Sequence, residues 1–510
     1  MPINIQDKEL MLYKNGIKES ENIWIEQDIV VPDSKPDVMQ IISTHVTPYV
    51  LNMEVSDGRV NVTGKLNYFI IYNTGDAKYG TRGIFVSHPF TQSLAVKGLK
   101  KDMNVIIKPV VKNVISSLPN ERKISVKSEI MFKISVKDFT RVKLINDFSS
   151  EKAIEKRVVS DKFSNVVSNK TSIVASREDI LLSKDAEDLF EILRIESEIK
   201  NTEIKESFNK IMLKGDIVLK LVYLTESDDT TVKNTSFVIP FTGMIEFDNI
   251  NDRTKFDVDY IMQDLEIEKN MDITTTKALS VEYRILADVT QYEEDEISYV
   301  EDFYSQYEEL DYNKREENVI KQIRKESYTV DVSESTSGAF DMQKLVDYSV
   351  DLNGISVSES IGGFKLSGNV KINMLMQNND SRQIESKNVE ILIDKEIKKE
   401  EDRGNEKNDI LISLDKSNVV QNENNLDISI SLRVDVEAKN EGNIQVIDEL
   451  NTKKINSENL DSMNIYIVKE NDDLWNIAKK YKTSIENIKK INEELRDDNL
   501  SVGQKILIIR

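Results

Sequence analysis

The residue types that carry most enzyme chemistry are scarce in this chain of 510 residues. It contains no cysteine, which excludes disulfides and thiolate metal sites. Its two histidines are His45 and His88, and a Ser-His-Asp site would need one of them as its general base. We expect both to be strand-edge or loop residues rather than catalytic groups.

Two common catalytic motifs are also missing from the sequence. The spacing of Gly363 and Gly368 fits the start of a G-x-x-x-x-G-K-[ST] phosphate loop, but Asn369 stands where the lysine is needed. No H-E-x-x-H occurs, and acidic pairs carry little information in a chain with 90 Asp and Glu residues. We therefore expect a protein that is not an enzyme and that uses no metal or cofactor.

The residue that favours binding over catalysis is Trp475. Lys479, Lys480 and Lys482 follow it and make this segment locally basic. Tryptophan is enriched in binding hot spots, where its truncation can cost about 2 kcal/mol or more. Trp475 lies one position off an apolar helical stripe, so two interpretations stay open. It packs over the next helix, or it stands partly exposed as a partner-binding hot spot.

The elements that must position Trp475 form a small unit over residues 463–510. Residues 465–469 and 505–509 are typical of strands, and a first helix has one apolar face made of Leu474, Ile477, Ala478 and Tyr481. Thr483 with Glu486 predicts a capping box that opens a second helix. The predicted order is β-α-α-β.

This unit resembles the LysM domain family. The residues that carry the resemblance are Tyr466, Val468, Asp472, Leu474, Trp475, Ile477, Ala478, Tyr481, Ile488, Asn492, Leu500, Val502, Gly503, Gln504 and Lys505. The sequence departs from the family at Asn471, where glycine is usual, and at Arg510, where proline is usual. Because asparagine tolerates positive φ better than most residues, we expect the turn to survive.

The LysM resemblance implies a groove for N-acetylglucosamine polymers between two loops. In this sequence the groove residues would be Asn471, Asp472, Leu474, Asn492 and Gly503. The competing interpretation is a protein partner that docks on the same unit, where Trp475, Lys479 and Lys482 would join those residues. Residues 1–12 lack the features of a secretory signal, so we expect a cytosolic chain and favour the protein partner.

One strand-length pattern, repeated three times, organises the rest of the chain. The copies are Val60–Tyr72, Ile211–Tyr223 and Phe364–Met376, which begin 151 and then 153 residues apart. Each is apolar at every second position, which predicts a long half-buried strand. Glycine at the third apolar-face position (Gly64, Gly215 and Gly368) predicts a bulge or a close backbone approach that a Cβ would block. Three such copies predict a repeated domain.

The first two copies align without a gap over about a hundred residues. Pro89-Phe90-Thr91 returns as Pro240-Phe241-Thr242, while the positions equivalent to the two histidines are Glu196 and Ile239. A repeated catalytic site would repeat its base, so this again argues against an enzyme. Many strands with polar turns predict a mainly β fold of sandwich- or barrel-like repeats. We also expect one accessory helix per repeat, at 35–42 and 185–194.

The opening of the first copy, Val31-Pro32-Asp33-Ser34-Lys35-Pro36-Asp37 followed by Ile41, resembles the SPOCS domain of bacterial spore-coat proteins. In the second copy Ser183 replaces the first proline. SPOCS repeats followed by LysM are similar to a clostridial family of spore-coat morphogenesis proteins. The resemblance implies a scaffold or adaptor in the mother-cell cytosol at the forespore surface, with the coat basement-layer ATPase SpoIVA as the partner of the LysM domain.

The predicted domains are residues 1–150 and 151–291 as SPOCS repeats, 292–326 as an acidic linker, 327–450 as a divergent third repeat, 451–462 as a linker and 463–510 as the LysM domain. The segment Tyr292–Asp311 has nine acidic residues, no basic ones and four tyrosines. Ile297, Val300, Tyr304 and Tyr307 fall at helical spacing. The alternative to a plain linker is therefore a short amphipathic helix that binds a partner through aromatic anchors.

Composition narrows the classes of partner. The formal net charge of −22 argues against nucleic acid and anionic lipid, because both need a basic surface. Residues 463–510 contain nine basic and eight acidic residues, so the acidic charge lies outside the LysM unit. No stretch reaches the roughly 18 apolar residues that a membrane span needs. Hydrophobic residues make up 39% of the chain, which is enough for several cores.

Overall fold

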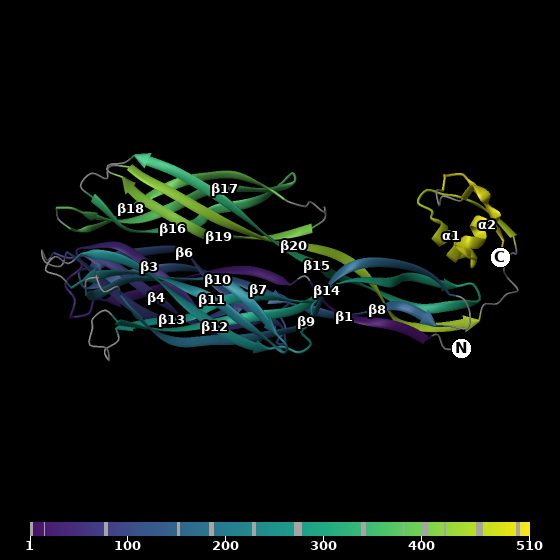
Figure 1. The fold of residues 1–510 in the computed structure, drawn as a ribbon, viewed down its shortest axis with the longest axis horizontal. Helices are drawn as coiled ribbons and strands as arrows, with labels where there is room; N and C mark the ends of the chain where they lie inside the picture. The colour runs from purple at the N-terminus through teal and green to yellow at the C-terminus, as the bar shows by residue number, and fades with distance from the viewer. Residues whose placement is uncertain are drawn as a thin grey trace.

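The computed structural model describes residues 4–14, 16–75, 80–149, 154–182, 188–226, 231–269, 278–337, 343–380, 382–399, 406–422, 425–454, 463–495 and 500–509. Most of these residues lie in β-strands, which confirms a mainly β fold. Three sandwiches lie side by side at one end of the molecule (Figure 1). A narrower stem extends from them, and the C-terminal unit lies near the far end of the stem.

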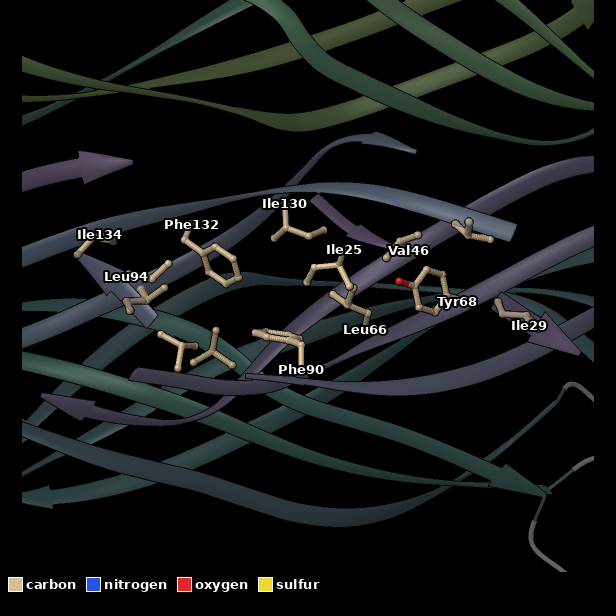
Figure 2. Close-up of a cluster of buried hydrophobic side chains, with 14 of the residues drawn as sticks. Ile25, Ile29, Val46, Leu66, Tyr68, Phe90, Leu94, Ile130, Phe132 and Ile134 are labelled. Atoms are coloured by element: carbon tan, nitrogen blue, oxygen red, sulfur yellow. The ribbon is translucent and has the colours of Figure 1, made fainter. Parts of the chain in front are cut away.

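The first sandwich packs two antiparallel sheets, ordered β2-β7-β6 and β3-β4-β5, around a common core. Its strands are β2 (Ile17–Val30), β3 (Gln40–Ser56), β4 (Arg59–Asn73), β5 (Thr81–Ala95), β6 (Asn104–Asn120) and β7 (Lys123–Lys137). Leu66 and Tyr68 of the central strand β4 lie in this core together with Phe90 and Phe132 (Figure 2). The repeated sequence pattern is thus the centre of a sheet.

The second and third sandwiches follow the same plan, with sheet orders β10-β11-β12 with β13-β14-β9, and β16-β17-β18 with β19-β20-β15, where the last sheet continues from β15 through β1 to β8. The second uses β9 (Ile154–Leu181), β10 (Leu189–Ser207), β11 (Lys210–Thr225), β12 (Val232–Glu246), β13 (Thr254–Lys269) and β14 (Ala278–Ser305). The third uses β15 (Glu308–Ser337), β16 (Gln343–Ser360), β17 (Gly363–Asn378), β18 (Ile384–Lys398), β19 (Glu406–Asn422) and β20 (Asn425–Lys454). Strands β4, β11 and β17 are equivalent, which confirms the threefold repeat.

The repeated glycines are needed for close packing, as predicted. A Cβ on Gly64 would lie 2.6 Å from Cζ of Phe90, and one on Gly215 would lie 2.6 Å from Cε1 of Phe241. Phe90 and Phe241 are the aromatic residues of the repeated Pro-Phe-Thr, so the two sequence features have one cause. The neighbouring strand also carries a bulge at Gly64 and at Gly215, and in the third copy the bulge lies two residues from Gly368, opposite Val370. In the third copy, which lacks Pro-Phe-Thr, Gly368 contacts the backbone of Gly354 instead.

No accessory helix occurs in the described residues of 35–42 and 185–194, so this prediction is wrong. Residues 31–39 form turns and extended backbone before β3, because the guanidinium of Arg122 binds the carbonyl oxygens of Val31, Pro32 and Lys35 at 2.8–3.0 Å. These bonds satisfy carbonyls without a helix. In the second repeat, residues 183–187 lie outside the described residues and residues 189–194 belong to β10.

Three antiparallel strand pairs extend from the sandwiches and pack together as the stem. The first is β1 (Asn4–Tyr13) with β8 (Phe139–Ser149), and the others are the outer halves of β9 with β14 and of β15 with β20. The segment predicted as a linker or amphipathic helix therefore lies mostly in β14 and β15, and both interpretations are wrong. A bulge between Val300 and Asp302 shifts the alternation of β14, which explains the misleading helical spacing.

The three sandwiches form a closed ring with pseudo-threefold symmetry. Strand β5 contacts β10, β12 contacts β16, and β18 contacts β3, so the last strand of this sheet in each repeat meets the first strand of the equivalent sheet in the next. One apolar cluster at the centre contains the equivalent residues Ile71, Val222 and Leu375, with Ile42, Leu193 and Val346. The three repeats thus pack into one body and are not separate domains joined by linkers.

Ion pairs between equivalent positions also join the repeats of this ring. Lys137 of the first repeat lies 2.5 Å from Asp288 at the equivalent position of the second repeat, and Asp288 is fully buried. Arg194 of the second repeat forms an ion pair with Asp347 at the equivalent position of the third repeat. Lys220 also binds Asp347, at 2.7 Å. Equivalent positions therefore carry opposite charges where the repeats meet.

Candidate functional site

The C-terminal unit has the predicted β-α-α-β order. Strand β21 (Met463–Ile467) pairs antiparallel with β22 (Lys505–Ile509), and helices α1 (Leu474–Tyr481) and α2 (Ile485–Ile491) lie between them in sequence. A 3-10 turn, Glu493–Leu495, follows α2. The buried core contains Val468, Leu474, Ile477, Ala478, Ile488, Leu495, Ile506 and Ile508.

The turn before α1 is held by two aspartates. Asp472 accepts hydrogen bonds from the Tyr466 hydroxyl and from the Lys469 N–H, both at 2.7 Å. The backbone N–H of Lys469, followed by the Tyr466 hydroxyl, lowers the pKa of Asp472. Asp473 caps α1 by accepting the Asn476 N–H at 2.6 Å. Asn471 adopts φ 65° and is exposed, so asparagine fills the turn position as expected.

The start of α2 differs from the predicted capping box. Ser484, not Thr483, is the N-cap, and its hydroxyl accepts the Asn487 N–H at 3.1 Å. The hydroxyl of Thr483 instead donates to the carbonyl oxygen of Ile509 at 3.3 Å, and Glu486 is exposed. Lys482 ends α1 in the left-handed conformation with φ 54°. This turn therefore begins one residue later than the sequence pattern indicates.

Asn492 joins α2 to the closing strand. Its side chain accepts the Leu507 N–H at 2.8 Å and donates to the Leu507 carbonyl at 2.7 Å. It also donates to the carbonyl oxygen of Ile488 at 2.8 Å and is buried. Because these partners use both ends of the amide, Asn492 supports the fold rather than a ligand.

Trp475 is buried, in one apolar cluster with Ile488 of α2 and with Tyr304. It is 8% exposed, and its ring meets Tyr304 edge-on with the ring centroids 5.0 Å apart. Its indole N–H donates to a carboxylate oxygen of Asp302 at 2.8 Å. Tyr304 and Asp302 belong to β14 in the stem, so the prediction of a partly exposed Trp475 is wrong, and the sequence did not anticipate its contact with the stem.

Asp302 is the centre of this contact. The ammonium of Lys479 donates to both of its carboxylate oxygens, at 2.6 and 2.8 Å, and Lys314 of β15 donates to it at 3.0 Å. Burial acts to raise the pKa of Asp302, but the bonds from Lys479, Trp475 and Lys314 outweigh burial and hold that pKa far below its usual range. Asp302 is therefore ionised at every physiological pH.

Two further contacts complete the interface between the stem and the C-terminal unit. The Tyr304 hydroxyl donates to the carbonyl oxygen of Thr483 at 2.7 Å. Arg157 of β9 lies 3.6 Å from Asp473. Tyr304 is 2% exposed and shares one apolar cluster with the core of the C-terminal unit. We call the set of Asp302, Tyr304, Trp475 and Lys479 the latch.

Comparison with known families agrees with this architecture. The model described as the SPOCS domain of SipL matches residues 37–118 and 188–270, and the LysM domain model matches residues 466–508. The chain combines SPOCS and LysM domains. The SPOCS segments cover strands β3–β6 and β10–β13, and the third sandwich repeats their topology. No curated protein and no solved structure matches the chain.

The predicted LysM site residues separate into three groups. Trp475 and Lys479 meet at the latch. Asn471 and Gly503 are exposed on the two loops, beside the partly buried Asp472. Leu474 and Asn492 are buried inside the domain, and Lys482 is the helix C-cap. The structure therefore does not bring all eight residues to one surface.

The stem residues of the latch were missed as LysM partners, although the sequence contained a signal. The acidic, tyrosine-rich segment 292–311 has the composition of a partner-binding segment with aromatic anchors, and Tyr304 is one of those anchors. Tyr304 does anchor a domain, but the domain belongs to the same chain and Tyr304 lies in a strand. No local pattern links residue 302 to residue 479.

Other classes of site have little support in the described part of the chain. No cluster of three or more His, Asp or Glu residues suited to a metal ion occurs there. Among the same residues no helix has the length and apolar character to cross a membrane. His45 lies in β3 and lines a cleft of about 1190 Å³ between the sandwiches, where Glu196, its repeat equivalent, also lies. His88 lies in β5.

Proposed function

We propose that this protein is a non-enzymatic scaffold or adaptor of spore coat assembly whose LysM domain docks a protein partner. The SPOCS and LysM matches indicate a sporulation-related protein with a LysM module. In the proposal the chain acts in the mother-cell cytosol at the forespore surface, and the partner is the coat basement-layer ATPase SpoIVA. The packed ring of SPOCS repeats supplies a rigid body, and the LysM domain supplies the contact.

The observation that carries the proposal is what Trp475 binds in this structure. Its partners are protein groups, a carboxylate and a tyrosine ring. Tryptophan beside a basic side chain is a common composition of protein-binding hot spots. The Trp475 face is therefore chemically suited to a protein partner.

Co-purification of the full chain with SpoIVA tests the proposal. Trp475→Arg is expected to abolish co-purification, while Lys490→Ala, an exposed change on α2, is expected to leave it intact. Circular dichroism confirms that both variants are folded. If the folded Trp475→Arg protein recovers as much SpoIVA as the unchanged chain, the docking face is not on this side of the LysM domain.

A glycan-binding function is the second candidate, and the LysM loops favour it. Gly503 has φ 86° and open space where a Cβ would lie, and Asn471 is exposed. These loops are free while the Trp475 face is occupied. Calorimetric titration of the full chain with N-acetylglucosamine oligomers tests this candidate. Saturable binding that persists in Trp475→Arg would support a glycan site separate from the latch.

A further inference from the structure

The latch is a binding site whose occupant is part of the same chain. We propose that the Asp302-x-Tyr304 segment of β14 is an internal competitor for the LysM face that contains Trp475 and Lys479. The external partner would then present the same chemistry, an extended segment with a carboxylate two residues before an aromatic ring. The identity of the partner rests on the proposed function, whereas the site and its internal occupant do not.

The chemistry of the occupant follows from strand geometry. Residues i and i+2 of a strand point to the same face, so Asp302 and Tyr304 reach the LysM domain together while Phe303 turns into the stem core. The carboxylate of Asp302 meets one indole N–H and one ammonium, and the Tyr304 ring meets the indole edge. The site thus recognises a carboxylate and an aromatic ring that lie two residues apart on one strand.

The equivalent stem position in the first repeat shows that this arrangement is not a general property of the stem. β8 has a bulge just before Asp147 in its pairing with β1, and β14 has the same bulge just before Asp302 in its pairing with β9, so Asp147 is equivalent to Asp302 and Ser149 to Tyr304. Asp147 accepts the ammonium of Lys156 and the Phe148 N–H. The carboxylate is thus present at both tips, but only the second repeat has the tyrosine beside it.

When the Asp302-x-Tyr304 segment occupies the Trp475 face, an external partner has less access to that face. Closure of the latch is unimolecular, so an external segment competes with an effective concentration on the order of millimolar. An apparent affinity falls in proportion to the fraction of molecules whose site is open. A partner with a matching segment therefore binds weakly until the latch opens or the partner displaces Asp302 and Tyr304.

The first experiment measures the latch itself, by fluorescence of Trp475 in a Trp24→Phe background. Trp24 and Trp475 are the two tryptophans of the sequence, so this background leaves one reporter. Asp302→Lys places a third ammonium beside Lys479 and Lys314, which is expected to open the latch and expose the Trp475 indole to water. We therefore expect red-shifted emission and at least about threefold stronger acrylamide quenching. Asp147→Lys is the matched control and is expected to leave both values unchanged.

The second experiment measures competition with a peptide of residues 298–306, which contains the Asp-x-Tyr spacing, and with SpoIVA. Both are titrated against the full chain, Asp302→Lys, Tyr304→Ser and the Asp147→Lys control. If the latch is open in a tenth or less of the unchanged molecules, the apparent affinity is reduced at least tenfold. We therefore expect both probes to bind the two opened variants at least about tenfold more tightly. A peptide with lysine in place of its aspartate is expected not to bind.

The outcomes separate the two proposals. Unchanged Trp475 emission in folded Asp302→Lys and Tyr304→Ser would overturn the latch. Opened variants that bind the peptide no more tightly than the unchanged chain would overturn the competition. Tighter peptide binding without any SpoIVA binding would support the competitor and overturn SpoIVA as partner. Thermal unfolding of each variant checks that the SPOCS body is intact.

Discussion

The first and second repeats share one backbone plan and differ in the groups that they place at equivalent positions. At the ring interface the first repeat carries Lys137 where the second carries Asp288, and these two residues pair with each other. At the stem tip the first repeat carries Ser149 where the second carries Tyr304, and Tyr304 contacts the LysM domain.

The difference separates two roles within one sequence pattern. The apolar positions and the repeated glycine build each sandwich, and there the repeats agree. The polar and tip positions join one part to another, and there the repeats differ because an asymmetric contact needs unlike groups. A change that makes one repeat more like the other is therefore expected to spare the sandwich and to break a junction.

The largest expected effect is at the ring. Asp288→Lys gives the second repeat the residue of the first and leaves two ammonium groups facing each other at a buried position. Breaking a buried ion pair costs about 3–5 kcal/mol, so we expect a loss of that size in the free energy of unfolding. Chemical denaturation measures it. The exchange Lys137→Asp with Asp288→Lys should recover much of the loss, and a variant that stays as unstable would show that the pairing is not what matters.

The next effect is at the stem tip. Tyr304→Ser gives the second tip the residue of the first and removes the ring contact with Trp475 and the bond to Thr483. Truncating a buried aromatic residue costs about 3–5 kcal/mol, and here the cost falls on LysM docking. We expect release of the LysM domain, visible as a larger radius of gyration by small-angle scattering. Ser149→Ala at the first tip should leave the scattering profile unchanged, and equal profiles for all three proteins would contradict the comparison.

The sequence predicted the parts of the fold that local periodicity determines. Alternation marked β4, β11 and β17, and the repeated glycine anticipated both the bulge and the close approach to Phe90 and Phe241. The helix over 35–42 was wrong because Arg122, far along the chain, binds the carbonyl oxygens of that segment. Capping signals around Pro36 report local preference and carry no information about a distant guanidinium.

The LysM domain could be predicted from the sequence, but the contact that Trp475 makes could not. The LysM pattern located Trp475 and its helix, but the partner of Trp475 lies 173 residues earlier in the chain. The acidic charge around Asp302 indicated a solvated linker, whereas four donors, two from the stem and two from the LysM domain, bind that carboxylate in the structure. A long-range contact between unlike modules leaves no periodic signal in one sequence.

The glycines offer a finer comparison of the same two repeats. A Cβ at Gly64 would meet the carbonyl oxygen of Tyr49 as well as Phe90, whereas a Cβ at Gly215 would meet side chains of Phe241 and Thr202. A backbone atom cannot rotate away, so Gly64→Ala is expected to cost about 3 kcal/mol and Gly215→Ala about 1 kcal/mol of unfolding free energy. Phe241→Leu should reduce the cost of Gly215→Ala, while Phe90→Leu should not rescue Gly64→Ala. Equal costs at both glycines would contradict this distinction.

The smallest effect concerns His45, which stands where the second repeat has Glu196. Burial lowers the pKa of His45 to about 4, against the partial opposition of Glu196. An unfolded histidine has a pKa of about 6.5, so between these values the unfolded chain binds a proton that the folded chain does not, and stability falls as the pH drops from about 6.5 to 4. Because His45 lines an open cleft, we expect its contribution to the pH-dependent change in the free energy of unfolding to be about 1 kcal/mol.

His45→Gln should flatten the pH dependence of denaturation midpoints over this range, and His88→Gln should leave it unchanged. If the slope survives in His45→Gln, the carboxylates of the ring rather than this histidine set the acid sensitivity of the first repeat.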